Sequence, residues 1–509
     1  MPLLYQGSDW TFERLKKAHD AIAEIALGEL GLDIYPPQIE VITSEQMLDA
    51  YASIGLPILY RHWSFGKRFA RDQTLYRKGY QGLAYEIVIN SDPCICYIME
   101  ENSMTMQALV LAHAAYGHNH FFKNNHLFRQ WTDAKGILDY LGFARDYVAH
   151  CEERHGIEAV ERVLDAAHAL QAQGINRYAR RPRRSLAEEL ARQKERQSYA
   201  ETTWNPLWST VPGLDPAVEL GGKDAGRLQE EGAPQIELPE ENLLYFLEKN
   251  SPVLHGWQRE ILRIVRMLAQ YFYPQRQTKL MNEGCATFVH YEIMSRLHER
   301  GMIDDGSFLE FLHAHTAVAQ QPDFADPRYS GMNPYALGFA IMKDIQRVCT
   351  APTEEDGAWF PDFAGSGDAM ATLREAWADY RDESFLLQFL GPKVIRDFRM
   401  IRLRDRADEP YFEVTAIHDD QGYRRIRAAL AAEYDCGRTD PDLHVASVDL
   451  LGDRKLVLEH RLQDDQRLDP ATLTKTLRFV RELWGYPVSM REVDAATGKE
   501  LPSGVTELS

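Results

Sequence analysis

Apolar residues recur at helical spacing through most of the first 390 residues, which predicts a mainly helical N-terminal region. The first helical segment ends at Pro36 and Pro37. Its apolar stripe consists of Phe12, Leu15, Ile22, Ile25 and Leu30. Within residues 85–99, two β-rich runs flank the turn-forming sequence Asn90-Ser91-Asp92-Pro93. We therefore expect one small β-hairpin inside this helical region.

The pattern changes after about residue 390. Short β-rich runs at 397–405, 411–418, 442–450 and 454–462 alternate with helical patterns near 421–433 and 470–484. This order predicts a ββαββα unit with an antiparallel sheet, because short turns such as Leu451-Gly452-Asp453 join neighbouring strands. We expect an α+β fold with a mainly helical domain at 1–390 and a C-terminal α+β domain at 391–509.

One internal stretch has no sustained periodicity. Residues 177–184 are strongly basic, which is typical of a solvated connector, and residues 200–238 combine scattered glycine and proline with acidic residues. Helical spacing resumes at Pro239. We therefore interpret 200–238 as an irregular excursion within the first domain and not as a domain boundary.

Composition narrows the class of protein. The chain has 509 residues, of which 45% are hydrophobic and 26% charged, as in ordinary globular proteins. Its net charge of −19 would repel a polyphosphate backbone, so we expect no nucleic-acid partner. Neither a basic, apolar leader nor a long apolar run occurs, which predicts no signal peptide, no membrane span and a cytoplasmic location. The six cysteines form no disulfide or zinc-ribbon pattern.

The densest group of possible metal ligands is His113, His118 and His120, at the end of a helix that Asn102 or Ser103 can cap. On a regular helix, His113 and His118 would point about 140° apart, because each residue turns the helix by about 100°. A π-bulge near Gly117, or a helix end with Gly117 in the left-handed conformation, would turn both imidazoles toward one point. Three histidines this close together indicate metal binding, although a lone histidine is more often structural.

A second cluster lies within residues 279–291. On a helix, Glu283, Thr287, His290 and Met294 form one stripe, because offsets of four, seven and eleven residues return to nearly the same angle. A carboxylate and an imidazole are then two turns apart on an otherwise apolar helix. They belong either to a site or to a pair of satisfied polar groups between helices.

A third group lies within residues 151–168. The carboxylate-x-x-His spacing of di-metal helical bundles occurs twice, in Glu152/His155 and in Asp165/His168. Glu161 and His168 lie at the edge of the apolar arc of one predicted helix, where half-buried side chains can point into a site. A surface helix with ordinary charge pairs would show the same spacing.

Long stretches of the chain resemble the SpoVR family, named for stage V sporulation protein R. These stretches are residues 89–125, 152–170, 257–291, 333–345 and 352–362. The resemblance implies a cytoplasmic bacterial protein linked to sporulation cortex formation in spore formers. In other bacteria it implies a link to stress or stationary-phase physiology, beside a PrkA-type serine kinase and a von Willebrand-type partner.

A looser likeness connects the first two clusters. Zinc peptidases of the gluzincin kind combine a histidine-bearing helix with a later Glu-Gly-x-Ala helix whose glutamate is a zinc ligand, and residues 283–286 look like the latter. His113 and His118 would take the histidine positions. Ala114 stands where HExxH enzymes carry the glutamate that activates water, so the base must come from elsewhere. The candidates for this base are Glu161, Glu152 and His168.

The first hypothesis is therefore a zinc-dependent hydrolase that cleaves an amide bond in a peptide or a cell-wall precursor. His113, His118 and Glu283 would be ligands, and His290 would be a fourth ligand or would support one. The residues expected to orient the substrate are Asn282, Lys279 and Tyr291. Two alternatives stay open: a non-catalytic regulatory module that acts with the kinase, and an iron or manganese protein built on the carboxylate-x-x-His pairs.

Overall fold

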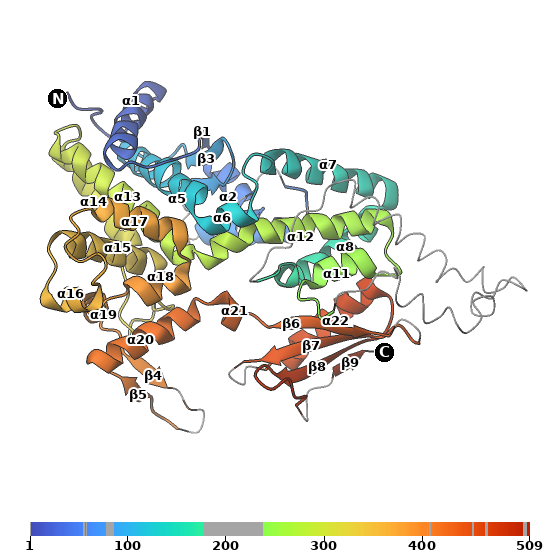
Figure 1. Cartoon of the computed structure of the whole chain (residues 1–509). Helices are drawn as coiled ribbons and strands as arrows, with labels where there is room; N and C mark the ends of the chain where they lie inside the picture. The colour runs from blue at the N-terminus through green and yellow to red at the C-terminus, as the bar shows by residue number, and fades with distance from the viewer. Residues whose placement is uncertain are drawn as a thin grey trace, which may run out of the picture. The chain divides into compact units, whose positions relative to one another are not determined.

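The structure is a computed structural model (Figure 1) that describes residues 2–53, 56, 59–77, 86–177, 238–404, 406, 409–449, 452–463, 467–501 and 506–508. Contacts divide the chain into two compact units, one of residues 1–161 and 270–440 and one of residues 162–269 and 441–509. The predicted excursion at 200–238 lies outside the described residues, apart from residue 238. The predicted boundary at residue 390 says that residues 1–390 and 391–509 fold as separate domains, and this stays a prediction.

Helices make up most of the first unit, as the helical spacing of its apolar residues predicts. They are α1 (Phe12–Ala23), η1 (Glu24–Glu29), α2 (Ser44–Ala52), α3 (Trp63–Arg77), α4 (Met104–Val110), η2 (Leu111–His118), α5 (Asn119–Asn124), α6 (His126–Trp131), α7 (Ile137–His155), α13 (Lys279–Glu299), α14 (Asp305–Val318), α15 (Pro334–Thr350), α16 (Glu354–Trp359), α17 (Ala369–Asp379), α18 (Asp382–Phe389), α19 (Pro392–Asp397), α20 (Asp420–Glu433) and α21 (Cys436–Thr439). The segments η1 and η2 are π-helical.

A small sheet of three strands lies against these helices. Strand β3 (Cys94–Met99) is central, pairs antiparallel with β2 (Glu86–Ile89) and pairs parallel with β1 (Pro37–Ile42). The predicted hairpin is therefore confirmed. Glu86 pairs with Ile98 and Val88 pairs with Cys96, so Glu86 shares the sheet face of Cys96 and Ile98, which are buried in the core. Because η2 packs on this face, Glu86 points toward the helix that carries the histidines.

Glycines let three helices approach one another at backbone contact. A Cβ on Gly117 would lie 2.5 Å from the Cα of Ala286, and a Cβ on Gly338 would lie 2.5 Å from the carbonyl oxygen of Leu280. Helix α13 consequently packs directly against η2 on one side and α15 on another. This close packing brings side chains of η2 and α13 to one place.

A buried carboxylate from a distant segment fixes the start of α13. The two carboxylate oxygens of Asp382 accept hydrogen bonds from the backbone N–H groups of Leu280 (2.8 Å) and Met281 (2.9 Å). These N–H groups have no partner within the helix, so Asp382 acts as its cap. The cap holds the first turn of α13, from which Asn282 and Glu283 project.

The remaining strands lie in the C-terminal part of the sequence. In the first unit, β4 (Arg402–Arg404) and β5 (Glu413–Ala416) form an antiparallel pair. The second unit contains the sheet of β6 (Leu443–Val448), β7 (Leu456–Leu462), β8 (Val488–Asp494) and β9 (Thr506–Leu508), with the helical segments η3 (Gln171–Gln173), α11 (Leu243–Asn250) and α22 (Pro470–Trp484). Helices α8 (Ile157–Ala169) and α12 (Gly256–Gln277) have residues in both units.

The α+β fold class is confirmed, and the predicted order of two strands, a helix, two strands and a helix occurs as β4, β5, α20, β6, β7 and α22. The sequence did not predict β8 and β9, and β4 and β5 form a sheet of their own instead of joining β6 and β7. One detail of the predicted sheet differs, because β7 and β8 pair in parallel while the other neighbours pair antiparallel. The reason is the connection: α22 carries the chain from the end of β7 back to the start of β8. Among the described residues, no helix is both long and apolar enough to cross a bilayer.

Candidate metal centre

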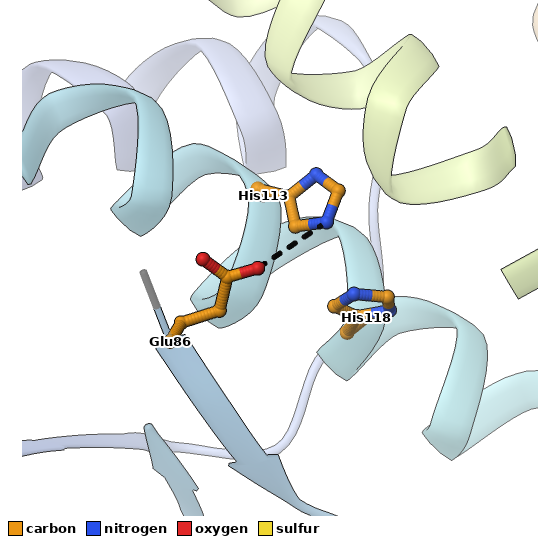
Figure 2. A group of neighbouring side chains, drawn as sticks. All are labelled: Glu86, His113 and His118. Carbon is orange, nitrogen blue, oxygen red and sulfur yellow. Dashed lines mark ion pairs between the residues drawn. The ribbon is translucent and has the colours of Figure 1, made fainter. Parts of the chain in front are cut away.

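Two histidines of η2 point to one side of the helix (Figure 2). In a π-helix the hydrogen bonds join residues five apart, so His113 and His118 are one turn apart. Their ring centroids are 4.6 Å apart. Of the two geometries predicted from their spacing, the π-helical one is present, and Gly117 has no left-handed backbone.

Two carboxylates face these imidazoles. The Nε2 atom of His113 lies 3.7 Å from Oε1 of Glu86 and 4.0 Å from Oε2 of Glu283, and Nε2 of His118 lies 3.6 Å from Oε2 of Glu283. Ligand atoms bound tetrahedrally at about 2.0–2.2 Å from one ion would be roughly 3.3–3.6 Å apart. The observed separations of 3.6–4.0 Å are longer than this spacing by up to roughly 0.7 Å.

The donor set fits a divalent cation. Within the described part of the chain, one group of three or more possible ligands has all its atoms within 4.8 Å of one another, and it consists of Glu86, His113 and His118. Oε2 of Glu283 is buried beside them without a hydrogen-bond partner. A buried carboxylate oxygen without a partner is costly, and a cation in contact with it would remove that cost.

The outer nitrogen of each imidazole is held by another side chain. Nδ1 of His118 lies 2.9 Å from Oδ1 of Asn282, which can only accept, so Nδ1 donates and the lone pair of Nε2 faces the carboxylates. Nδ1 of His113 lies 2.9 Å from Nδ1 of His290, whose Nε2 lies 2.9 Å from Nδ1 of His315. Metal-binding histidines are typically supported in this way.

Burial keeps the centre free of excess charge. Burial, together with the charge of Glu283, raises the pKa of Glu86 to about 8. Burial and the neighbouring imidazoles hold the pKa of His113 and of His290 well below the usual range. Burial also lowers the pKa of His315 to about 4. Neutral imidazole is the form that binds a metal ion.

Two tyrosines complete the polar lining. The hydroxyl of Tyr51 donates to the backbone carbonyl of Glu86 over 3.3 Å, and Tyr335 lies close enough to Glu283 for that carboxylate to raise the pKa of its phenol. Burial first, and then the charges of Glu86 and Glu283, raise the pKa of both phenols. Both hydroxyls therefore stay protonated and can donate hydrogen bonds.

The sequence-predicted residues are distributed unevenly around this centre. The structure brings His113, His118 and Glu283 together and places Asn282 against His118. His290 lies behind His113, in contact with its outer nitrogen, and the ring of Tyr291 lies 5.2 Å from that of His315. Lys279 is exposed at the start of α13, where its charge acts on Asp382.

The three residues predicted as bases are not members of the metal-capable group. They are Glu152, Glu161 and His168. Burial and the charge of Glu161 raise the pKa of Glu152, so those two carboxylates lie near each other on α7 and α8. Their catalytic role stays a prediction.

Sequence reasoning missed Glu86, Tyr51, Tyr335 and His315. A signal for Glu86 was present in the strand pattern, because Glu86 and Val88 occupy alternate positions and Val88 faces the core. A carboxylate on a core-facing strand position is unusual, since such groups are rarely buried without a partner. The two tyrosines and His315 carry no comparable local signal.

Comparisons with known proteins agree along the whole chain. The family model described as "SpoVR like protein" matches residues 9–439, and the model described as "SpoVR-like C-terminal domain" matches residues 441–495. The chain is 53% identical over 489 residues to the "Uncharacterized protein YcgB" of Escherichia coli strain K12, and the match covers 96% of this chain and 94% of that protein. No solved structure matches the chain.

Proposed function

The chain belongs to the SpoVR family, and we propose that it is a zinc-dependent hydrolase that cleaves an amide bond. One observation carries this proposal: two histidines of η2 and a glutamate of α13 converge, although 165 residues separate His118 from Glu283 in the sequence. Two histidines and a glutamate are the ligands of thermolysin-type zinc centres. We further propose that the substrate is a peptide or a cell-wall precursor.

His113, His118 and Glu283 would hold the ion. When bound, Zn²⁺ would polarise the carbonyl of the amide and lower the pKa of a water molecule toward neutrality. The same three side chains also suit iron or manganese. Our proposal is zinc, and metal analysis of the purified protein distinguishes the three metals.

Glu86 would act as the general base in this proposal; its pKa is raised to about 8 by burial and by the charge of Glu283, and the positive charge of a bound ion would lower that pKa so that the carboxylate can accept a proton. Its carboxylate faces His113 from strand β2, 3.7 Å from Nε2, on the side where Glu283 also lies. In HExxH enzymes this carboxylate follows the first histidine in sequence, whereas Ala114 occupies that position here. Glu86 would take a proton from the attacking water and pass it to the leaving nitrogen. It thereby replaces Glu152, Glu161 and His168 as our preferred base.

Tyr335 and Tyr51 would stabilise negative charge on the carbonyl oxygen. Both hydroxyls lie beside the two carboxylates and are protonated donors. A donor fixed in a water-poor site stabilises a developing oxyanion more strongly than water does, and losing one typically reduces the rate about 10²–10³-fold. The PrkA-type kinase and the von Willebrand-type protein stay proposed partners.

Metal analysis of purified protein tests the proposal. We expect zinc at about one ion per chain in the wild type and a loss of it in Glu283→Gln, which keeps the shape but removes the charge. Glu299→Gln is the matched control, because Glu299 lies on the same helix and is exposed. A chelator should lower the melting temperature of the wild type and the control, but not that of Glu283→Gln.

The catalytic part of the proposal needs its own variant. Glu86→Gln should retain zinc and lose hydrolysis of peptides and muropeptides, since it removes the base and keeps the fold. If wild type and Glu283→Gln bind no metal and melt alike with and without chelator, the hydrolase proposal is wrong. Stoichiometric iron in place of zinc would also overturn it.

A further inference from the structure

Three buried imidazoles form a continuous hydrogen-bonded row that starts at the metal centre. His113 comes from η2, His290 from α13 and His315 from α14, and the three residues are 4%, 4% and 8% exposed in that order. The two contacts in the row, Nδ1 of His113 to Nδ1 of His290 and Nε2 of His290 to Nδ1 of His315, are each 2.9 Å long. Helix α14 is thereby connected to the centre although it supplies no ligand.

Each neutral imidazole carries one proton, so the row permits two arrangements of protons. In the first, Nδ1–H of His113 donates to His290, and Nε2–H of His290 donates to His315. In the second, every donor and acceptor is exchanged, and the proton of His113 sits on Nε2. Only the first arrangement leaves a lone pair on Nε2, the atom that faces Glu86 and Glu283.

We propose that His290 and His315 are positioning residues that keep His113 in the tautomer able to bind a metal ion. His290 supplies the acceptor that the Nδ1–H of His113 needs, and His315 supplies the acceptor that keeps the other proton of the pair on Nε2 of His290. This inference rests on the proposed zinc centre. It assigns His290 a place outside the ligand set and gives a role to His315, which lies two contacts away from His113.

Rings around His315 hold it in place for this role. Its imidazole packs against Phe339, Tyr291 and Phe311 at centroid distances of 4.8, 5.2 and 5.8 Å. These rings restrict how the imidazole can turn, so its Nδ1 stays directed at His290. This packing keeps the contact between His290 and His315 in place, so the row of imidazoles extends to α14.

Substitutions at His290 separate the two ends of its ring. Asparagine places an oxygen near the position of Nδ1, so His290→Asn should keep the acceptor for His113 and bind Zn²⁺ within about threefold of the wild type. Glutamine reaches the position of Nε2 instead, so His290→Gln leaves Nδ1 of His113 without its partner. We expect the dissociation constant for Zn²⁺ to rise about 10–100-fold in His290→Gln.

The same comparison at His315 tests whether this residue affects the tautomer of His113 through His290. His315→Asn keeps an acceptor for Nε2–H of His290 and should bind Zn²⁺ like the wild type. His315→Leu removes the acceptor, favours the reversed arrangement of protons, and should raise the dissociation constant about tenfold or more. Circular dichroism checks the fold of each variant, and if the His290 variants fail to fold, the His315 pair decides alone.

Titration of each purified, metal-stripped protein with Zn²⁺ gives three distinct results. Weak binding by the Gln and Leu variants, with wild-type binding by both Asn variants, supports the inference. Equal binding by all variants overturns it and leaves the zinc centre intact. A wild type that binds no Zn²⁺ overturns both the proposed function and this inference.

Discussion

The contact of α13 with α15 determines whether the side chains of the centre meet, and one substitution tests this directly. Gly338 of α15 lies against the first turns of α13, and an added Cβ would be 2.5 Å from the carbonyl oxygen of Leu280 and 2.8 Å from the Cα of Gly284. Both are backbone atoms, so neither can move aside as a flexible side chain would. Gly338→Ala must therefore push the two helices apart.

The magnitude follows from the overlap. Ordinary contact begins at 3.4 Å, which leaves the new Cβ roughly 0.9 Å too close to the Leu280 oxygen in an interior packed like a crystal. Overpacking of this kind costs about 1–3 kcal/mol. Alanine returns up to about 1 kcal/mol through its better helix propensity. We expect the free energy of unfolding to fall by about 1–2 kcal/mol.

Gly142→Ala is the matched control. Gly142 lies inside α7 of the same unit, and a Cβ there would meet nothing within 4 Å, so the same substitution should stabilise by about 0.5–1 kcal/mol. Urea unfolding followed by circular dichroism measures both variants, and zinc titration should show weaker binding in Gly338→Ala alone. If Gly338→Ala is as stable as Gly142→Ala, the helices are not in the close contact described here.

Two further predictions concern other parts of the first unit. Arg347 donates to both carboxylate oxygens of Asp356 and holds the pKa of that buried group well below its usual range, so Asp356→Asn should cost about 3 kcal/mol at pH 7 in urea unfolding. A carboxylate whose pKa is lowered by folding stabilises the folded state at pH values above its pKa in the unfolded chain, which is about 3.9. The difference in unfolding free energy between wild type and Asp356→Asn should therefore shrink as the pH falls below about 4. A difference that does not change with pH would contradict this. Trp377 is fully buried against His120 and Phe288, so Trp377→Ala should cost about 3–5 kcal/mol, and a loss below about 1 kcal/mol would refute that packing.

Local signals in the sequence were sufficient for much of the fold. The turn at 90–93 joins two strands as predicted, because a turn involves only neighbouring residues. The first helical segment does not extend to Pro36 and Pro37 as predicted: it ends at Glu29, Gly31 follows with a left-handed backbone (φ +61°), and Pro37 begins β1. The parallel pairing of β7 and β8 was not predicted because β8 (Val488–Asp494) was not identified as a strand; once it is, a helix between two strands of one sheet predicts that they run in the same direction.

The position of Glu86 shows where local information ends. Strand alternation identifies which residues share a face, but the partner of that face is set by the packing of η2, α13 and the sheet. Ala114 shows that the residue after His113 is not the base. It does not exclude a base that lies on another helix or strand. The charged segments of α7 and α8 were therefore the predicted source of the base, because no local signal connects β2 to η2.

His290 illustrates a second physical limit. Residues seven apart on a helix share a direction, which placed Glu283 and His290 on one stripe, but they are also separated by about 10.5 Å along the axis. Two ligands of one ion at about 2 Å bonds cannot span that separation unless their long side chains converge. The structure resolves this geometry by putting His113 between them: its Nε2 lies 4.0 Å from Glu283 and its Nδ1 lies 2.9 Å from His290. The shared stripe therefore places Glu283 and His290 at opposite nitrogens of one imidazole, so one pattern positions both the proposed ligand and the group that holds the outer nitrogen of His113.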